Sequence, residues 1–304
     1  MKVVFFGTPQ FAVPFVRHLH ADKRIKLEAV VTQPDKPAGR KKTMTPPPVK
    51  EFAQKMGIPV FQPEKIKNNS EFIKTIKEIK PEFIIVVAYG AIFPKEILEI
   101  PKVDCINVHA SLLPRYRGAS PIQSALLNGD KETGISFMSM DEKLDTGDIY
   151  LLKKVAIADD DNQESLFEKL SDIGATLLPS ILRDIKDGIL TPIPQYESLA
   201  SYCKKISKDD AQIHPEKEDA VNIENKFKAF TPWPGIYMVF KGKRLKLLDI
   251  KELETEEKLN AGKLISLKER LLLGTKNGIL EIKKIQPEGK KPMSAHEFIN
   301  GFLS

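Results

Sequence analysis

The sequence predicts an α/β protein of two domains, with a parallel sheet in the first and a small β-barrel in the second. Three observations support this prediction: a length of 304 residues, apolar runs that alternate with helical patterns in the first half, and a series of short β-type runs near the C-terminus. Hydrophobic residues make up 41% of the chain and charged residues 29%, as in ordinary folded proteins.

In the first half, apolar runs ending in glycine or polar residues predict strands, and apolar residues at helical spacing predict helices. We expect strands over residues 2–7, 27–32, 58–61, 83–88 and 105–109, and helices over 11–20, 48–57, 70–79 and 94–98, with Ser70 as the cap of the third helix. Strands that alternate with helices favour a parallel sheet covered on both faces, with its ligand site beyond the carboxyl ends of the strands.

The second half changes in pattern. We expect a strand over residues 149–157, helices over 164–185 and 216–230, and a linker in the stretch 188–195, which contains two prolines and a glycine. Five short β-type runs follow, over residues 237–240, 245–250, 263–266, 271–274 and 279–285. Five short strands separated by turns predict a small barrel.

Composition excludes several classes of protein. No apolar run reaches the ~18–20 residues of a membrane span, and the first residues lack the features of a signal or import peptide. Cys105 and Cys203 stand in unrelated contexts, and the histidines show no ligand spacing. We therefore expect a cytoplasmic protein with no membrane partner and no bound metal.

The net charge is +6, and most of the excess lies after residue 200. A basic surface of this kind attracts polyanions such as nucleic acid, although a lysine-rich solvated surface gives the same count.

Asn107 and His109 are the strongest candidates for catalytic residues. A strand alternates its side chains, so both residues point to the same face at the carboxyl end of the strand that contains them. An amide and an imidazole aimed together can stabilise an oxyanion and move a proton. The alternative is an Asn that caps a turn beside a His bonded to the backbone.

Three other segments are candidates for binding or catalysis. Residues 111–118 form a polar, basic loop that directly follows this strand, and residues 140–148 form a turn with three aspartates and a glutamate. Residues 33–48 form a long basic segment, expected to be a loop without regular structure and suited to phosphate backbones. Each is also compatible with an ordinary surface loop. Gly7-Thr8-Pro9 matches neither the dinucleotide fingerprint nor the P-loop.

Taken together, these segments are similar to the folate-dependent formyltransferases. The resemblance rests on Asn107-Val108-His109-Ala110-Ser111-Leu112-Leu113-Pro114-Arg115-Tyr116-Arg117-Gly118 followed by Leu144-Asp145-Thr146-Gly147-Asp148, and it extends over essentially the whole chain. The basic segment 33–48 and the C-terminal region resemble the branch of the family whose acceptor is a charged tRNA.

The resemblance implies a Rossmann-like N-terminal domain over residues 1–189, a linker over 190–206 and an OB-like C-terminal tRNA-binding domain over 207–304. It implies formyl transfer from 10-formyltetrahydrofolate to the α-amino group of methionine on initiator tRNA, by a monomer. The implied catalytic residues are Asn107, His109 and Asp145. The implied folate-contacting residues are Ser111, Leu112, Leu113 and Pro114, and the implied tRNA-binding residues are Lys36, Arg40, Lys41 and Lys42.

Two other functions remain open on the sequence. A related formyltransferase could act on a small amine such as a glycinamide nucleotide or an amino sugar, but it would not need the segment 33–48. A non-catalytic RNA-binding protein could use an OB-like module, but it would not need Asn107, His109 and Asp145 together.

Overall fold

The computed structural model describes residues 1–304 except 40, 41, 256 and 304. By its internal contacts the chain divides into two compact units. The first comprises Met1–Pro121, Glu132–Ala156 and Phe167–Cys203, and the second comprises Ile122–Lys131, Ile157–Leu166 and the chain from Lys204 onward. None of the helices in the described part of the chain is long and apolar enough to cross a membrane.

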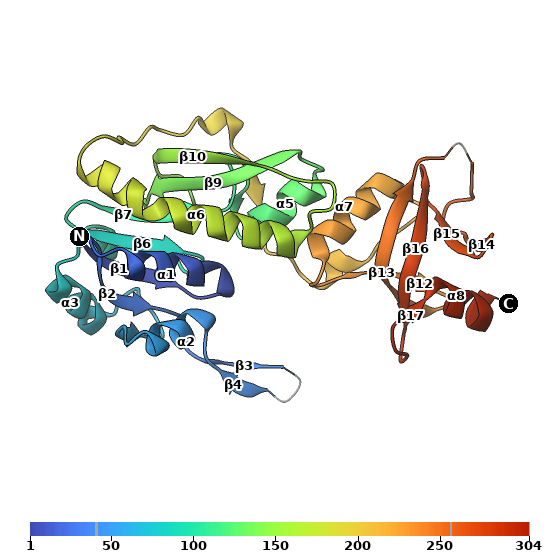
Figure 1. Ribbon diagram of the computed structural model, residues 1–304, viewed down its shortest axis with the longest axis horizontal. Helices are drawn as coiled ribbons and strands as arrows, with labels where there is room; N and C mark the ends of the chain where they lie inside the picture. The colour runs from blue at the N-terminus through green and yellow to red at the C-terminus, as the bar shows by residue number, and fades with distance from the viewer. Residues whose placement is uncertain (40–41, 256, 304) are drawn as a thin grey trace. The chain divides into compact units, whose positions relative to one another are not determined.

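The first unit is built on a seven-stranded sheet in the order β10-β9-β7-β6-β1-β2-β5 (Figure 1). Its strands are β1 (Lys2–Gly7), β2 (Lys26–Val31), β5 (Val60–Phe61), β6 (Phe83–Val87), β7 (Asp104–His109), β9 (Glu132–Ser139) and β10 (Ile149–Ala156). The five strands from β7 to β5 are parallel, whereas β9 and β10 are antiparallel to their neighbours. The predicted parallel α/β sheet is confirmed.

Helices cover both faces of this sheet, as predicted. The helices of the unit are α1 (Val13–Ala21), α2 (Pro48–Lys55), α3 (Ser70–Ile79), α4 (Lys95–Leu98), most of α6 (Gln163–Lys186) and the start of α5 (Pro121–Leu127), with short 3-10 turns at Gln10–Ala12 and Glu197–Leu199. On one face, the ring of Phe6 packs edge-on against Phe72 of α3, with ring centroids 6.3 Å apart. On the other face, a Cβ added at Gly174 of α6 would lie 2.8 Å from the ring of Phe15 in α1. Glycine at this position therefore lets the two helices approach closely.

Strand β9 was not predicted from the sequence. It contains Gly134, Ser136 and Ser139, residue types that favour strands weakly. Its position explains why it is stable: β9 pairs with β7 on one side and β10 on the other, and six of its eight residues are buried.

The segment 33–48 is not the irregular loop that we expected. It contains a hairpin, in which β3 (Lys36–Ala38) pairs antiparallel with β4 (Thr43–Thr45). Threonine at both ends of β4 favours a strand, and Gly39 takes the positive φ of 69° that a tight connection needs. At the base of the hairpin, Lys50 Nζ lies 2.8 Å from both carboxylate oxygens of Asp35.

The second unit carries a sheet of six antiparallel strands, in agreement with the predicted C-terminal β domain. Its strands are β12 (Ile236–Phe240), β13 (Lys243–Leu253), β14 (Leu264–Leu267), β15 (Arg270–Gly274), β16 (Ile279–Pro287) and β17 (Met293–Ser294). Helix α7 (Ala220–Phe230) begins four residues later than predicted, because residues 214–218 form a turn in which Lys217 N and Glu218 N donate to the carbonyl of His214. The unit also contains α5 after Pro121, the start of α6, a 3-10 turn (Asp209–Ala211), α8 (Ala295–Phe298) and a π-helical turn (Ile299–Leu303).

The cap of α3 differs from the predicted one. Asn69, not Ser70, is the N-cap residue, and its Oδ1 accepts a hydrogen bond from Phe72 N at 3.1 Å. The side chain of an N-cap residue must reach the backbone N–H two or three positions further on, and Ser70 already lies inside the first turn.

We expect Asn69→Ala to lower the free energy of unfolding of the first unit by about 1 kcal/mol, because the N–H of Phe72 loses its partner. Ser70→Ala, the matched control, should change this free energy by less than about 0.5 kcal/mol. Urea unfolding followed by circular dichroism measures both, since the single tryptophan, Trp233, lies in the second unit. Equal losses for the two variants would contradict the assignment of the cap.

Candidate active site

The candidate site lies at the carboxyl ends of the parallel strands. The strand order changes direction at β1: β2 and β5 lie on one side of it, and β6 and β7 lie on the other. Open α/β sheets place their ligands at such a switch point. The strand ends here are Gly7 of β1, Val87 of β6 and His109 of β7.

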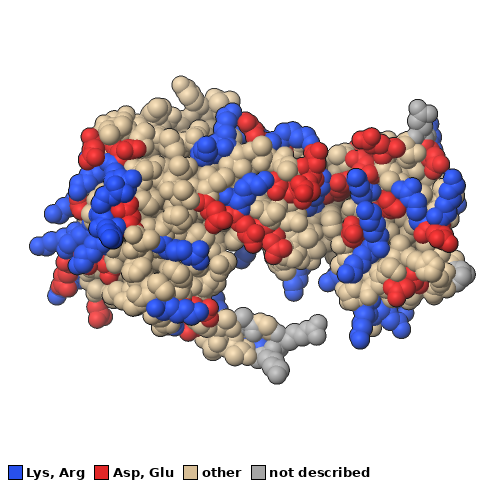
Figure 2. Space-filling view, in the orientation of Figure 1, with Lys and Arg blue, Asp and Glu red and all other residues tan. Residues whose placement is uncertain are grey.

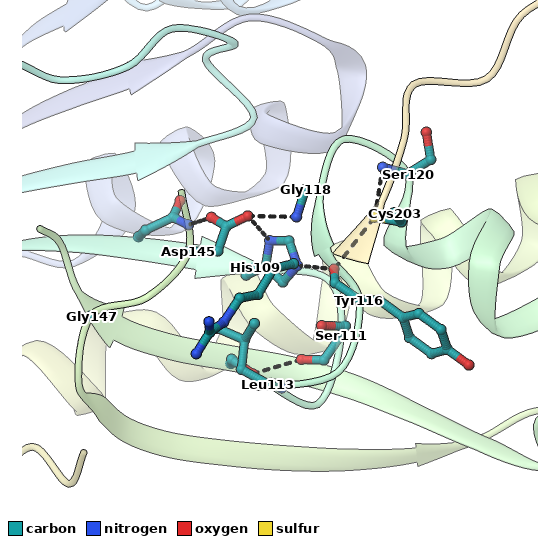
Figure 3. A network of polar contacts seen from close by, with 12 residues as sticks. His109, Ser111, Leu113, Tyr116, Gly118, Ser120, Asp145, Gly147 and Cys203 are labelled. Carbon is teal, nitrogen blue, oxygen red and sulfur yellow. Dashed lines mark hydrogen bonds and ion pairs between the residues drawn. The ribbon is translucent and has the colours of Figure 1, made fainter. Parts of the chain in front are cut away.

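The structure brings together the three predicted catalytic residues. Asp145 lies in the turn between β9 and β10, and its Oδ1 accepts a hydrogen bond from Asn107 Nδ2 at 3.3 Å. Its other oxygen, Oδ2, accepts from Gly118 N at 2.8 Å and lies 3.7 Å from His109 Nδ1 (Figure 3). The side chain of His109 is 7% exposed and that of Asp145 is 11% exposed. The carboxylate is therefore shared by an amide, an imidazole and a backbone N–H.

The backbone of Asp145 is unusual. Its φ is +55°, in the left-handed region that residues other than glycine rarely adopt. Such a conformation is found at functional sites more often than elsewhere, where surrounding contacts hold it in place. In the same turn, a Cβ on Gly147 would lie 1.9 Å from the carbonyl oxygen of Ser139, so only glycine fits against β9 there.

The imidazole of His109 is held by a second backbone group. Its Nε2 lies 2.9 Å from the carbonyl oxygen of Tyr116, a residue that also has a positive φ, of 59°. A carbonyl oxygen can only accept a hydrogen bond. Nε2 therefore carries a proton and donates a hydrogen bond to the Tyr116 carbonyl. In the neutral ring, Nδ1 then carries the free lone pair, and it faces the Asp145 carboxylate at 3.7 Å.

The predicted folate-contacting segment forms the loop after β7. Ser111 and Leu113 are buried, and Ser111 Oγ donates to the carbonyl of Arg115 at 2.6 Å. Ser136 of β9 fastens the same loop, because its Oγ accepts from Leu113 N at 3.0 Å and donates to the carbonyl of Ser111 at 2.6 Å. Only Leu112 and Pro114 of the four keep partly exposed side chains.

The predicted tRNA-binding residues belong to a different segment, the hairpin. Lys36 lies on β3, Lys42 follows in the turn with a φ of 50°, and both are exposed. Arg40 and Lys41 lie outside the described residues.

A segment that we expected to be only a linker contributes to the site. Residues 193–203, called the strap below, contact residues 117–118, 145–147 and 149. Ile193 exchanges two backbone hydrogen bonds with Ile149 of β10, and β11 (Tyr202–Cys203) pairs with β8 (Arg117–Gly118). Within the strap, Gln195 Nε2 donates to the carbonyl oxygens of Asp145 and Gly147. No local pattern in the sequence marked Gln195, which follows a proline in an irregular stretch.

Two titratable groups of the sheet region, Tyr89 and Cys105, are buried. Burial raises the pKa of Tyr89 to about 12, and its ring packs against Phe6 with centroids 5.3 Å apart. Burial also raises the pKa of the Cys105 thiol on β7, so the thiol stays protonated. Both side chains belong to the hydrophobic core.

In the part of the chain that the structure describes, no group of three or more His, Cys, Asp or Glu is placed to hold a metal ion.

Comparison with protein families and known proteins identifies the class. Residues 1–182 match the formyl transferase family, and residues 205–303 match the formyl transferase C-terminal domain. The chain belongs to the formyl transferase family. It belongs there with the methionyl-tRNA formyltransferases: it is 47% identical to that of Caldicellulosiruptor saccharolyticus (99% of this chain, 97% of the relative) and 49% identical to that of Thermodesulfovibrio yellowstonii (98% and 95%).

Solved structures share the fold at lower identity. WlaRD, a sugar 3N-formyl transferase crystallised in the presence of dTDP and 5-N-formyl-THF, matches with a TM-score of 0.68 and 17% identity, over 96% of this chain and 99% of that one. HypX from Aquifex aeolicus, in complex with tetrahydrofolic acid, matches with a TM-score of 0.62 and 16% identity, over 100% of this chain and 48% of that one.

We expect the neutral ring of His109 to carry its proton on Nε2, because Tyr116 offers only an acceptor. Nitrogen-15 NMR of histidine-labelled protein distinguishes the two tautomers, and a His109→Gln sample assigns the signal. A neutral ring protonated on Nδ1 would show that Asp145, and not the Tyr116 carbonyl, fixes the tautomer.

Proposed function

We propose that this chain transfers the formyl group of 10-formyltetrahydrofolate to the α-amino group of methionine carried on initiator tRNA. Its relationship over nearly the full length to methionyl-tRNA formyltransferases supports this function. The observation that carries the chemistry is the meeting of Asn107, His109 and Asp145 at the end of β7.

In this reaction the protein must perform three tasks. The unprotonated amine of methionine attacks the formyl carbon, a C–N bond forms, and the carbonyl oxygen becomes negative. Collapse of this tetrahedral intermediate breaks the bond to folate N10. The amine loses one proton and N10 gains one. The protein must therefore stabilise the oxyanion, accept a proton and return one to the leaving nitrogen.

Asn107 and His109 are suited to these tasks. The Asn107 amide uses one N–H on Asp145 Oδ1 and has a second one for the oxyanion. His109 Nδ1 accepts the proton that the amine loses, the protonated ring stabilises the oxyanion, and Nδ1 passes the same proton to N10 as the bond to N10 breaks. The Asp145 carboxylate, 3.7 Å from Nδ1, orients the ring or a bridging water. No step in this scheme requires a metal.

Folate binding falls to the loop after β7. Ser111 Oγ already has a partner within the loop, so we propose that backbone groups of residues 111–114 and the side chains of Leu112 and Pro114 contact the donor.

The acceptor is a polyanion, and basic side chains are placed for it on two segments. Lys36 and Lys42 are exposed on the hairpin, and we propose that they bind the tRNA together with Arg40 and Lys41, which lie outside the described residues. In the second unit, β13 and β16 carry exposed lysines (Figure 2): Lys243, Lys246, Lys251, Lys283 and Lys284. We propose a catalytic domain over residues 1–189 and a tRNA-binding domain over 207–304, joined by a linker over 190–206 whose residues 193–203 contribute to the catalytic site. We propose that the protein is a monomer that acts in the cytoplasm. Binding through phosphates weakens as salt rises.

The direct test offers labelled 10-formyltetrahydrofolate with three acceptors: initiator Met-tRNA, uncharged initiator tRNA and glycinamide ribonucleotide. We expect label on Met-tRNA alone, because the basic segments serve a charged tRNA and the reacting group is its amine. Label on the small amine alone would support formyl transfer but contradict the proposal that the substrate is a charged tRNA. Binding of tRNA without any transfer would favour a non-catalytic RNA-binding protein.

We expect Asn107→Ala to lower kcat by about 10²–10³-fold while the Kd for Met-tRNA stays nearly unchanged, because an oxyanion donor acts mainly in the transition state. Single-turnover formylation and a tRNA-binding assay separate the two effects. Asn128→Ala, which changes the same residue type in a different segment, is the control. Equal losses in rate and affinity for Asn107→Ala would assign this residue to substrate binding instead.

A further inference from the structure

We propose that Gln195 of the strap is a positioning residue, which holds the backbone of Asp145 in the conformation that aims its carboxylate at His109. The inference rests on the proposed function, since it assigns Gln195 a part in the same reaction. Gln195 has no predicted role, and it lies outside the 1–182 and 205–303 regions that match the two family models.

The side-chain amide of Gln195 uses all of its hydrogen-bonding capacity. Nε2 donates to the carbonyl oxygen of Asp145 at 2.9 Å and to that of Gly147 at 2.7 Å. Oε1 accepts from Arg117 Nε at 3.1 Å and from Arg117 Nη2 at 2.9 Å. The amide can take only this orientation, because a guanidinium only donates and a carbonyl only accepts. A side chain with two donors and two acceptor sites is therefore required.

Arg117 supplies the rigid support for this amide. Its side chain is fully buried, and it also donates to the carboxylate of Glu197 and to the hydroxyl of Tyr202, both in the strap. The next residue, Gly118, donates its backbone N–H to Asp145 Oδ2. Strand β8 therefore holds Asp145 in two ways. Gly118 binds the carboxylate directly, and Arg117 acts on the backbone of Asp145 through Gln195.

The backbone of Asp145 needs such support. Its positive φ of 55° is intrinsically unfavourable for a residue with a side chain. A change of φ at this position swings the carboxylate away from His109 Nδ1, since the side chain turns with its own Cα. The strap is well fixed for this purpose, because Ile193, two residues before Gln195, is paired with Ile149 at 2.8 and 2.9 Å.

The structure offers a substitution that separates the two ends of Gln195. Gln195→Glu keeps acceptor oxygens for Arg117, so the strap retains its partner, but it removes both donors to the turn at 145–147. We expect kcat to fall about tenfold or more, because small misplacements of catalytic groups cost up to about 10²-fold. We expect the KM values for Met-tRNA and for the formyl donor to change less than about twofold, since the substitution removes no contact that binds the substrates in the ground state.

Two further measurements exclude a merely structural role. In an Asp145→Asn background, Gln195→Glu should lower the single-turnover rate by less than about twofold, because coupled residues are not additive. Amide hydrogen exchange of residues 145–148 should become faster in Gln195→Glu while the thermal midpoint changes little. The control Gln54→Glu makes the same change at an exposed position of α2, and it should keep wild-type kcat.

The outcomes distinguish this inference from the proposed function. An inactive wild-type enzyme would reject the function, and the exchange measurement would still test whether Gln195 holds the turn. An active wild type with an equally active Gln195→Glu variant would overturn the positioning role. Fully additive losses in the double variant, or a raised KM at unchanged kcat, would overturn it as well.

Discussion

The carboxylate of Asp145 is the point on which the arrangement of the site depends. It accepts hydrogen bonds from a side chain of β7 and from the backbone of β8, and it lies beside the imidazole that ends β7. A charged group that is mostly buried must be compensated by donors or by opposite charge. The chain satisfies this requirement with segments far apart in sequence, so the same contacts that stabilise the charge also fix the relative positions of Asn107, His109 and Asp145.

Much of the fold follows from local pattern. The buried strand β6 and the amphipathic helix α3 have bounds close to those predicted, because a continuous apolar run and a helical spacing each have few alternatives. β9 and the hairpin of β3 and β4 escaped prediction for opposite reasons. β9 owes its strand conformation to two neighbouring strands, whereas the hairpin is a local structure in a polar segment rich in proline and lysine.

The site was predictable in part. The spacing of two residues on one strand placed Asn107 and His109 together, and the resemblance to formyltransferases added Asp145. The supporting groups were not predictable, because they are backbone atoms or long-range partners. The carbonyl of Tyr116 and the N–H of Gly118 have no residue-type signal, and Gln195 meets Asp145 across 50 positions of sequence. Folded geometry alone reveals contacts of this kind.

The location of the strap has an evolutionary consequence. The two regions that match family models end at residue 182 and resume at residue 205, and the strap lies between them. A gene fusion that joined a catalytic module cut at the first boundary to a new C-terminal module would discard Ile193, Gln195 and the partners of Arg117. The contacts of the candidate site therefore extend through Cys203, and recombination between relatives keeps these contacts only when the connecting segment is inherited together with residues 1–182.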